Sequence, residues 1–440
     1  APEELLMLAP QKDIFLIGLD PFNRQELEDL RHADRYHFHE LLSYDEIKGG
    51  GRFTFTGALE KAEERLRNFG GAPDGIVTFW DFPATSLLAV LTDTHRLPGP
   101  TLESTLKCEH KYWSRLEQER AAPEACPAFE ALDPFAEDAA DGVKIDFPFW
   151  IKPVKGTGSY LAYKVSDRAE LDKALEQIRG NIERIARPFN HILERADLPE
   201  EVRRVDGRHC IVEASMKGSL HTVTGYVHRG EITLYGLVDS LNYPNTSSFL
   251  NYEYPSSLPR PIEERMGEIS RRVIARLGLD DSPFNIEFFH DPEEDRFGLL
   301  EVNPRVSQSH AEIFRQVDGD SDEAIAVQLA LGEDPDWSRG EGPAAFGAKF
   351  YVRRFRDGFV RAVPSAENLA AVKREFPGVV IEIEAEAGKR LSEDATEDSY
   401  SYDLAHLHFG ADSREGLHEQ FEALRERLEF DIEEVEGNGA

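Results

Sequence analysis

The chain has 440 residues, of which 40% are hydrophobic and 10% aromatic, which is too apolar for a disordered tail and long enough for two or three domains. Its 50 Lys and Arg against 83 Asp and Glu give a formal net charge of -33, which repels phosphate backbones and anionic lipid, so we expect neither nucleic acid nor membrane as a partner. No apolar run approaches the roughly 20 residues of a membrane-spanning helix. We therefore expect a cytoplasmic protein and leave a homodimer open.

The first hundred residues alternate short apolar runs with amphipathic stretches, a rhythm typical of a parallel sheet with crossover helices. Asp20 and Pro21 are suited to cap and begin the first helix. No second or third glycine follows Gly18, so the dinucleotide fingerprint is missing and NAD is not expected. We predict a Rossmann-like domain over residues 1–100 that forms one wall of a cleft. Its predicted strands are 13–19, 36–42 and 75–80, and its predicted helices are 24–32, 56–69 and 83–93.

The remainder of the chain predicts an α+β domain over residues 101–335, with a lid subdomain near 145–215, and a capping domain over 336–440. A loop-rich segment contains Pro123, Pro127 and Pro134. The predicted strands are 148–152, 161–165, 209–214, 221–228, 232–238, 282–290 and 296–302, with 348–354, 378–383 and 404–410 in the cap. The predicted helices are 167–196, 261–277, 309–317, 322–331 and 413–428. We regard residues 180–206 as a helical insertion.

Two carboxylates and an amide stand on two successive predicted strands. Alternate side chains of a strand share a face, so Glu301, Asn303 and Arg305 project to one side. If the two strands pair through the acidic turn 291–295, Glu287 falls near Glu301. Carboxylate and amide oxygens suit Mg²⁺ or Mn²⁺, which also keep places for water and phosphate oxygens. The alternative is a solvated polar face on an edge strand.

A lysine and a glycine-rich turn close another apolar strand. Lys152 ends the strand, and the turn carries Gly156, Thr157, Gly158 and Ser159. Backbone N–H groups of such a turn can surround an anion while the lysine supplies a point charge to a phosphate. The alternative is an ordinary hairpin with a cationic end, and no P-loop signature follows.

A third strand ends in Glu213, before a turn at Gly218. A strand end of this kind can offer main-chain groups to the edge of a flat base, while the carboxylate accepts from an exocyclic amine. Many exposed strand ends look the same.

The order of these blocks resembles the ATP-grasp superfamily, which includes D-alanine-D-alanine ligase, biotin carboxylase and the L-amino acid ligases. The blocks are a lysine helix (Lys111), the strand lysine with its glycine-rich turn, the strand-end Glu213, an N-x-E strand (Glu287) and the E-x-N-P-R run from Glu301. The resemblance covers roughly residues 100 to 320. It implies a mixed α/β and α+β multidomain fold that binds ATP with Mg²⁺ or Mn²⁺.

The resemblance also implies roles for individual residues. Lys111 and Lys152 would contact ATP phosphates, and Gly156, Thr157, Gly158 and Ser159 would form a flexible lid over them. Glu213 would accept from the adenine amine, Ala214 and Met216 would give backbone contacts, and His221 would contact ribose or phosphate. Glu287, Glu301 and Asn303 would bind the metal, and Arg305 would hold an acyl-phosphate or its carboxylate.

The sequence after Arg305 should open the next helix beside the metal site. We expect Arg305, Ser307, Ser309 and His310 to line the substrate end, with Arg305 and His310 as catalytic residues and His310 as a base or a carboxylate contact. The alternative is hydroxyls that cap a helix and a histidine that bonds a carbonyl. His406 and His408 lack acidic partners at ligand spacing, and we expect them to be structural or exposed.

The function implied by the resemblance is an ATP-dependent carboxylate-amine ligase that works through an acyl-phosphate and releases ADP and phosphate. Its partners would be a small-molecule carboxylate and an amine, with amino acids among the candidates. Such a reaction needs cations placed along the triphosphate rather than a protein nucleophile. Two alternatives stay open, namely a carboxylase-type enzyme that uses bicarbonate and a non-catalytic ATP-binding regulator.

Overall fold

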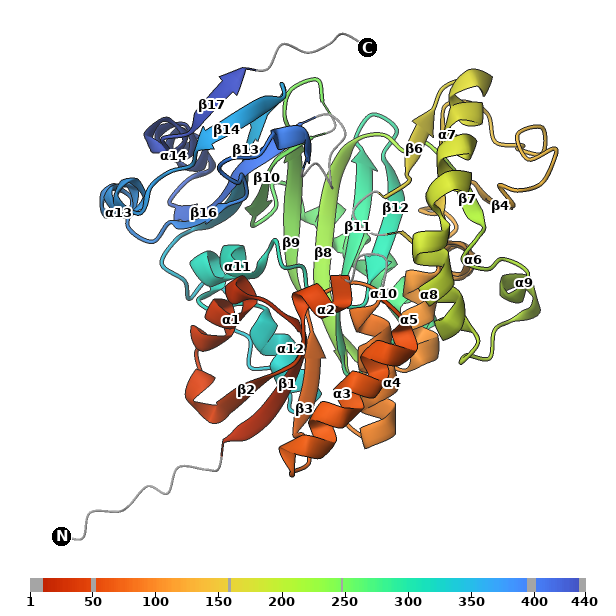
Figure 1. Ribbon diagram of the computed structural model, residues 1–440, viewed down its shortest axis with the longest axis horizontal. Coiled ribbons are helices and arrows are strands. Elements are labelled where there is room, and N and C mark those ends of the chain that lie inside the picture. Colours follow the sequence, from red (N-terminus) through yellow and green to blue (C-terminus); the bar gives the residue numbers. More distant parts are fainter. Residues whose placement is uncertain (1–10, 49–52, 157–159, 247, 394–400, 435–440) are drawn as a thin grey trace.

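The computed structural model describes residues 11–48, 53–156, 160–246, 248–393 and 401–434 (Figure 1). The N-terminal part is a parallel sheet in the order β2-β1-β3. Asp20 accepts a hydrogen bond from the backbone N–H of Asn23 (2.8 Å), and Pro21 begins the first helix, as predicted. The strands are β1 (Lys12–Leu19), β2 (Tyr36–Ser43) and β3 (Gly75–Thr78), and the helices are α1 (Pro21–Glu28), α2 (Tyr44–Lys48), α3 (Phe55–Phe69) and α4 (Ala84–His95).

Two further helices lead from this part to an antiparallel four-stranded sheet in the order β4-β7-β5-β6. The helices are α5 (Leu102–Glu109) and α6 (Lys111–Ala121), and the strands are β4 (Phe129–Leu132), β5 (Phe149–Pro153), β6 (Tyr163–Val165) and β7 (Cys210–Ala214). The segment predicted to be loop-rich therefore contains β4. A strand of four residues is too short to show its alternation among prolines.

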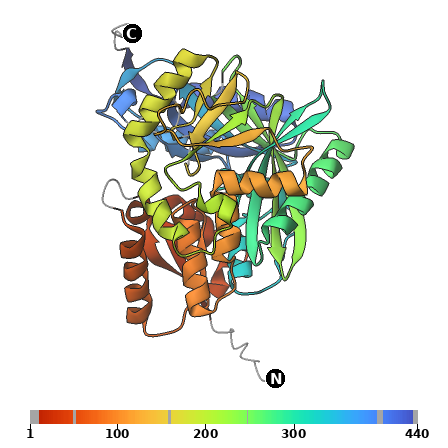
Figure 2. The ribbon, with the colours of Figure 1, turned by 90° about the vertical axis from the view of Figure 1, so that its right-hand side faces the viewer.

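The predicted helix 167–196 is divided into α7 (Arg168–Asn181) and α8 (Glu183–Leu193), followed by α9 (Glu200–Arg203). The two long helices serve different cores. Leu171 and Ile178 of α7 pack on the four-stranded sheet, whereas Phe189 of α8 joins the N-terminal core, where its ring meets Phe82 edge-on. Figure 2 shows both helices running along one side of the molecule between these two parts. The predicted insertion thus connects the four-stranded sheet to the N-terminal part.

The largest element is an antiparallel sheet in the order β12-β11-β8-β9-β10-β13-β16-β15. Helix α10 packs on β8 and β9, while α11 packs on β10, β13 and β16. The strands are β8 (Ser219–His228), β9 (Glu231–Asn242), β10 (Phe249–Tyr254), β11 (Ser282–Asp291), β12 (Arg296–Asn303), β13 (Phe346–Arg354), β15 (Val380–Ile383) and β16 (Tyr402–Ala411). The helices are α10 (Arg260–Leu277), α11 (Ala311–Asp318) and α12 (Glu323–Ala330).

The C-terminal strands belong to this same sheet, so the predicted domain boundary at residue 335 falls between strands that pair. The division into domains remains a prediction. The sequence analysis did not predict β10, which joins the two halves of the sheet. The other C-terminal elements are α13 (Ala366–Glu375), α14 (Arg414–Arg427) and a small sheet of β14 (Gly358–Ala362) with β17 (Asp431–Glu434).

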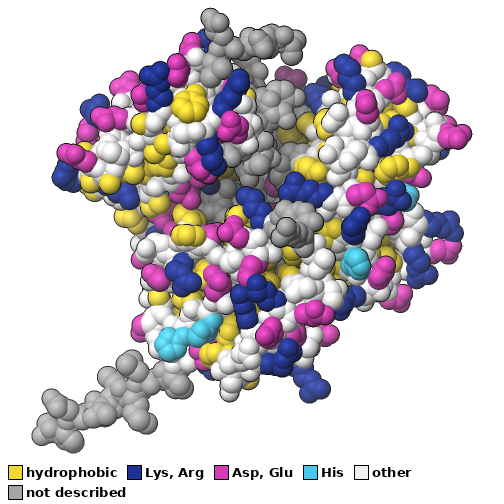
Figure 3. All heavy atoms as spheres, viewed as in Figure 1, with side chains coloured by type: hydrophobic (Ala, Val, Ile, Leu, Met, Phe, Trp, Pro, Cys, Tyr) yellow, Lys and Arg dark blue, Asp and Glu magenta, His cyan; other side chains and the backbone are white. Residues whose placement is uncertain are grey.

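Surface charge is mixed rather than segregated. On the face shown in Figure 3, Lys and Arg side chains lie among Asp and Glu, and the described residues of this face form no continuous basic patch. Within the described ranges, no helix is both long enough and apolar enough to cross a membrane.

Candidate functional site

The hairpin of β11 and β12 brings the predicted carboxylates together. Glu287 is paired directly with Glu301, and Asn285 with Asn303, so the predicted pairing through the acidic turn is confirmed. Burial and the charge of Glu301 raise the pKa of Glu287 to about 7. Burial also raises the pKa of Glu301, but the ammonium groups of Lys111 and Lys152 outweigh it, so its pKa lies below the usual value. The carboxylate of Glu301 is therefore stabilised in its ionised form, whereas that of Glu287 is not.

Asn303 is fixed within the same hairpin. Its Nδ2 donates to Oδ1 of Asn285 (2.9 Å) and lies 3.5 Å from Oε1 of Glu287. Nδ2 of Asn285 donates to the carbonyl oxygen of Arg305 (2.9 Å), which holds the chain that leaves β12 against β11. The run from Glu301 to Arg305 is thus anchored on both sides of the hairpin.

This set fits a hard divalent cation by its chemistry. Like charges directly opposite on neighbouring strands repel each other, and the raised pKa of Glu287 shows that Lys111 alone does not balance the two carboxylates. Two carboxylates and an amide are oxygen donors of the kind that Mg²⁺ and Mn²⁺ accept. Among the described residues, no group of three or more His, Cys, Asp or Glu could hold a metal, so a cation here would rely on Asn303 and on oxygens from outside the protein.

A network of cations borders the carboxylates. Nζ of Lys111 lies 3.1 Å from Oε1 of Glu301 and donates to the carbonyl oxygen of Gly156 (3.2 Å). Nζ of Lys152 lies 2.7 Å from Oε2 of Glu213, and Nε of Arg115 donates to Oε1 of the same carboxylate (2.6 Å). Burial raises the pKa of Glu213, but Arg115 and Lys152 lower it to about 2. Lys111, Lys152 and Glu213, which the sequence separates by up to a hundred residues, thus share one network.

The remaining predicted nucleotide contacts lie around this network. Ala214 ends β7, and the side chain of Met216 fills the space over Gly298, where an added Cβ would come 2.5 Å from its sulfur. Thr157, Gly158 and Ser159 lie outside the described residues. Lys155, which the sequence analysis did not select, is buried in an ion pair with Glu109.

His221 lies in a different setting from the one the resemblance implies. Its β8 neighbours Leu220 and Thr222 line the cavity described below, so His221 projects from the opposite face of the strand. Its Nδ1 is 2.8 Å from Oδ1 of Asp239, and its Nε2 is 2.7 Å from the hydroxyl of Ser219. Both ring nitrogens therefore already have partners.

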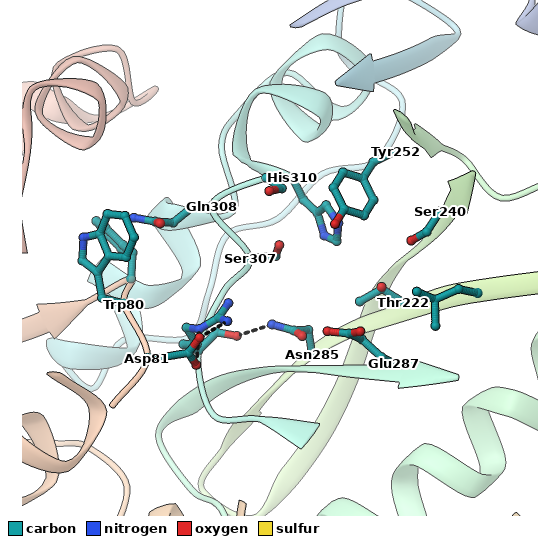
Figure 4. Close-up of a pocket in the computed structure, with 14 residues that line it drawn as sticks. Trp80, Asp81, Thr222, Ser240, Tyr252, Asn285, Glu287, Ser307, Gln308 and His310 are labelled. Carbon is teal, nitrogen blue, oxygen red and sulfur yellow. Dashed lines mark hydrogen bonds and ion pairs between the residues drawn. The ribbon is translucent and has the colours of Figure 1, made fainter. Parts of the chain in front are cut away.

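A cavity of about 220 Å³ opens beside Glu287 (Figure 4). Arg305 lines this cavity, and its Nε and Nη2 donate to the two carboxylate oxygens of Asp81 at 2.8 and 2.7 Å. Asp81 follows β3, so the N-terminal part does supply one wall of the cavity. The lining residues are Phe79, Trp80, Asp81, Leu220, Thr222, Ser240, Tyr252, Asn285, Glu287, Arg305, Ser307, Gln308, Ser309 and His310.

The residues after Arg305 line the cavity as a group, in agreement with the sequence analysis. Ser307, Ser309 and His310 all contribute to the wall. The ring of His310 is buried and meets the ring of Tyr252 edge-on, with centroids 5.1 Å apart. Burial, with the charges of Lys349 and Arg305, lowers the pKa of His310 to about 3. The imidazole is therefore neutral at physiological pH, and so low a pKa makes it a weak proton acceptor, which favours a hydrogen-bonding role over that of a base.

Several site residues were not found from the sequence. Asp81 stands at the exit of a predicted strand of the N-terminal domain, and this position could have singled it out. Asn285 lies in the quoted N-x-E strand. Tyr252 gave no signal because its strand, β10, was not predicted.

Comparisons with known proteins show what the chain is similar to. Residues 145–312 match the family model described as an ATP-grasp domain. A carbamoyl phosphate synthase large chain from Xylella fastidiosa is 26% identical over 229 residues, which cover 50% of this chain but 19% of that protein. The chain thus spans about a fifth of the length of this relative.

Solved structures extend the likeness over nearly the whole chain. An L-amino acid ligase from Bacillus licheniformis superposes with a TM-score of 0.77 at 17% identity, covering 96% of this chain and 99% of that chain. A biotin carboxylase from Campylobacter jejuni gives a TM-score of 0.62 at 15% identity, with coverages of 96% and 92%. At these identities the likeness establishes the fold. Residues 145–312 thus match an ATP-grasp domain, and the chain as a whole shares the fold of these solved structures.

Proposed function

We propose that this protein is an ATP-dependent carboxylate-amine ligase, which activates an acid as an acyl-phosphate, joins it to an amine and releases ADP and phosphate. The observation that carries the proposal is the position of Glu287. It is paired with Glu301 beside the Lys111 and Lys152 network, and it also lines the cavity that holds Arg305 and His310. A phosphate donor and a small acid could therefore meet at one point.

The chemistry explains why these residue types gather there. A carboxylate is a poor electrophile, because attack must add charge to a group that is already anionic. Transfer of a phosphoryl group creates a good leaving group, and catalysis then depends on positioning and on charge stabilisation. In this proposal Lys111 and Lys152 contact the phosphates, and Arg305 orients the acid. Mg²⁺ or Mn²⁺, held by Glu287, Glu301 and Asn303, would neutralise phosphate charge.

The nucleotide would lie between β5, β7 and the central sheet. Lys152 and Glu213 end strands of the four-stranded sheet, and Lys111 begins α6 across from them. We assign Glu213, Ala214 and Met216 to the adenine edge. Glu213 could accept from an amine only if it exchanged one of its two ion-pair contacts. His221 would reach a ribose only after its ring turned away from Asp239.

The substrate cavity suits a small polar substrate. Its volume of about 220 Å³ lies below the roughly 300–1,000 Å³ of sites for drug-sized ligands. Its wall combines hydroxyls, amides and charges with the rings of Trp80 and Tyr252. Amino acids fit this description, and the L-amino acid ligase with the same fold is named for such a reaction.

A screen for ADP release tests the proposal. The purified full chain would be incubated with ATP and Mg²⁺ and a matrix of acids and amines, with each acid and each amine also tested alone. ADP release that requires both partners, with the coupled product seen by mass spectrometry, supports the ligase. Release with no dependence on an amine contradicts it.

A second candidate is an enzyme that phosphorylates bicarbonate. The sequence relative named above is a carbamoyl phosphate synthase, and a biotin carboxylase shares the fold. ADP release driven by bicarbonate without any organic acid would select this candidate. Binding of ATP without turnover across the whole matrix would instead favour the non-catalytic regulator.

A further inference from the structure

The far wall of the cavity continues into the C-terminal strands along one face of the central sheet. Ser240 of β9 pairs with Tyr252 of β10, Tyr252 pairs with Lys349 of β13, and Lys349 pairs with His408 of β16. Residues paired directly across strands lie on the same face. Ser240 and Tyr252 line the cavity, so Lys349 and His408 are the next residues along the same row.

Lys349 is a buried cation with no carboxylate partner. Lys349 is only 7% exposed. No ion pair or hydrogen bond joins its side chain to any residue in the described ranges. Its ammonium lies 5.3 Å from the centroid of the Tyr351 ring. The other buried cations of the cleft are all paired, in the combinations Lys111–Glu301, Lys152–Glu213, Arg115–Glu213, Lys155–Glu109 and Arg305–Asp81.

Unsatisfied polar atoms surround this ammonium. Within the described residues, Nδ1 of His310 and Nδ1 of His408 are buried without a hydrogen-bond partner. Nε2 of His408 is 2.8 Å from Oε2 of Glu382, so this histidine does have an acidic partner, contrary to the sequence analysis. That partner comes from β15 across the sheet, which spacing along the chain could not show. Burying an unpaired charge beside unpaired donors is costly unless a ligand completes the set.

The missing partner should be an anion. Lys349 supplies a cation, and the neutral ring of His310 can supply one N–H donor, which together suit a carboxylate. His408 does not add a second donor, because its single N–H, on Nε2, is directed at Glu382. Burial raises the pKa of Glu382, but hydrogen bonds from His406 and His408 and the nearby charge of Lys349 lower it. Glu382 accepts from Nε2 of His408, and no ion pair or hydrogen bond joins it to Lys349. Arg305, the other cation of the cavity, is neutralised by Asp81.

We propose that Lys349 binds the free carboxylate of the amine substrate, so that the acceptor is an amino acid rather than a simple amine. This inference rests on the proposed ligase function and sharpens it. The acid to be activated would lie near Glu287 and Arg305, and the acceptor would extend past Tyr252 and His310 toward β13. His310 would then donate a hydrogen bond to the acceptor.

The test compares amino acids with their carboxamides, which keep the amine and remove the anionic charge. Binding to the full chain, loaded with Mg²⁺ and a non-hydrolysable ATP analogue, would be measured by calorimetry for wild type, Lys349→Met and Lys349→Arg. Wild type should prefer an amino acid over its amide by roughly 10- to 100-fold, the usual strength of a charge-assisted hydrogen bond. Lys349→Met should abolish most of this preference, and Lys349→Arg should keep part of it.

Two further measurements separate this role from a structural one. Lys349→Met should leave the melting temperature unchanged or raise it, because an unpaired buried charge is removed. The exposed Lys373 on α13 provides the matched control, and Lys373→Met should keep the wild-type preference.

The outcomes distinguish this inference from the ligase proposal. Carboxylate-dependent binding that Lys349→Met removes, without ADP release from any pair, would keep the Lys349 site and reject the ligase. If ADP is released but Lys349→Met still prefers an amino acid over its carboxamide as strongly as wild type does, the Lys349 site is rejected and the ligase proposal is kept. Absence of amino-acid binding to wild type would also overturn the Lys349 assignment.

Discussion

Two of the clusters of buried carboxylates in this protein differ in the charges that surround them. In the cleft cluster, formed by Lys111, Arg115, Lys152, Glu213 and Glu301, each carboxylate has a cation within 3.1 Å. Both acids consequently have pKa values below the usual range. Opposite charge keeps these two acids ionised, whereas burial and the charge of Glu301 raise the pKa of the neighbouring Glu287.

The junction cluster lies where α1 meets α11 and α12, and it is formed by Glu26, Glu312, Arg315, Asp322 and Glu323. Arg315 contacts Glu26 (2.9 Å) and Glu312 (3.0 Å). Within the described residues, neither oxygen of Glu323 has a partner. Burial raises the pKa of Glu312 and of Asp322 to about 7, and that of Glu323 well above its usual value.

The difference between the two clusters shows that burial alone does not set the protonation state of a carboxyl group. With several cations nearby, a buried carboxylate stays charged and can organise a site for phosphates or a metal. In the junction cluster a single arginine faces four acids, and the pKa values of these acids are raised instead. Charge is therefore concentrated at the cleft, and we expect substitutions there to change activity, whereas those at the junction should change stability.

The largest effect should come from Glu301→Ala. Loss of this carboxylate removes one of the two carboxylates of the proposed metal set and frees Lys111, so ADP release should fall by at least roughly 1,000-fold, or about 4 kcal/mol in the activation barrier. Circular dichroism should show that the fold is retained. Glu294→Ala, in the exposed turn of the same hairpin, is the control. Near-normal ADP release in Glu301→Ala would contradict the metal assignment.

Arg115→Met should produce the largest loss of stability. Arg115 is 2% exposed and also donates to the carbonyl oxygens of Leu299 (2.7 Å) and Leu300 (2.9 Å), so its loss leaves several buried acceptors unpaired. Breaking such a buried pair destabilises by about 3 kcal/mol. Denaturant unfolding would measure this. Arg120→Met, which removes an arginine from the exposed side of the same helix, should cost less than about 1 kcal/mol. Equal losses in the two variants would reject the special role of the buried network.

Lys152→Met should weaken binding of ATP with Mg²⁺ by roughly tenfold to a hundredfold, because one charge-assisted contact to the phosphates is lost. Calorimetry on the full chain would report the change. Lys164→Met provides the comparison, since Lys164 is exposed and lies opposite Trp150 on the neighbouring strand. An affinity unchanged from wild type would remove Lys152 from the phosphate site.

The remaining effect develops gradually with pH and concerns the junction cluster. The pKa of Asp322 is about 7 in the folded protein and close to 3.8 when unfolded, so the folded state binds more protons between these values. Its contribution to the free energy of unfolding therefore falls as pH rises from about 4 to 7, by about 1 kcal/mol per pH unit. Asp322→Asn should flatten this dependence relative to wild type, and the exposed Asp138→Asn should not. Parallel pH profiles for wild type and Asp322→Asn would contradict the assignment.

The sequence predicted much of the frame because local signals were strong. The cap at Asp20, the alternation in β11 and β12 and the turn between them all follow from neighbouring residues. The order of the motif blocks predicted the ATP-grasp domain that residues 145–312 match, and the run after Arg305 predicted one wall of the cavity. The prediction of a single helix over 167–196 was wrong, because its two halves pack on different cores. A local sequence pattern does not indicate which core a segment joins.

By itself, then, the sequence determined which residue types recur at which spacing, and through them the fold and the carboxylate hairpin. Only the tertiary structure decided which charges meet. Arg305 finds Asp81 across 224 positions, Lys152 finds Glu213, and Lys349 forms no ion pair with any carboxylate of the described residues. The physical reason is that electrostatic pairing depends on distance in space, and an antiparallel sheet brings together strands whose separation along the chain carries no information about it.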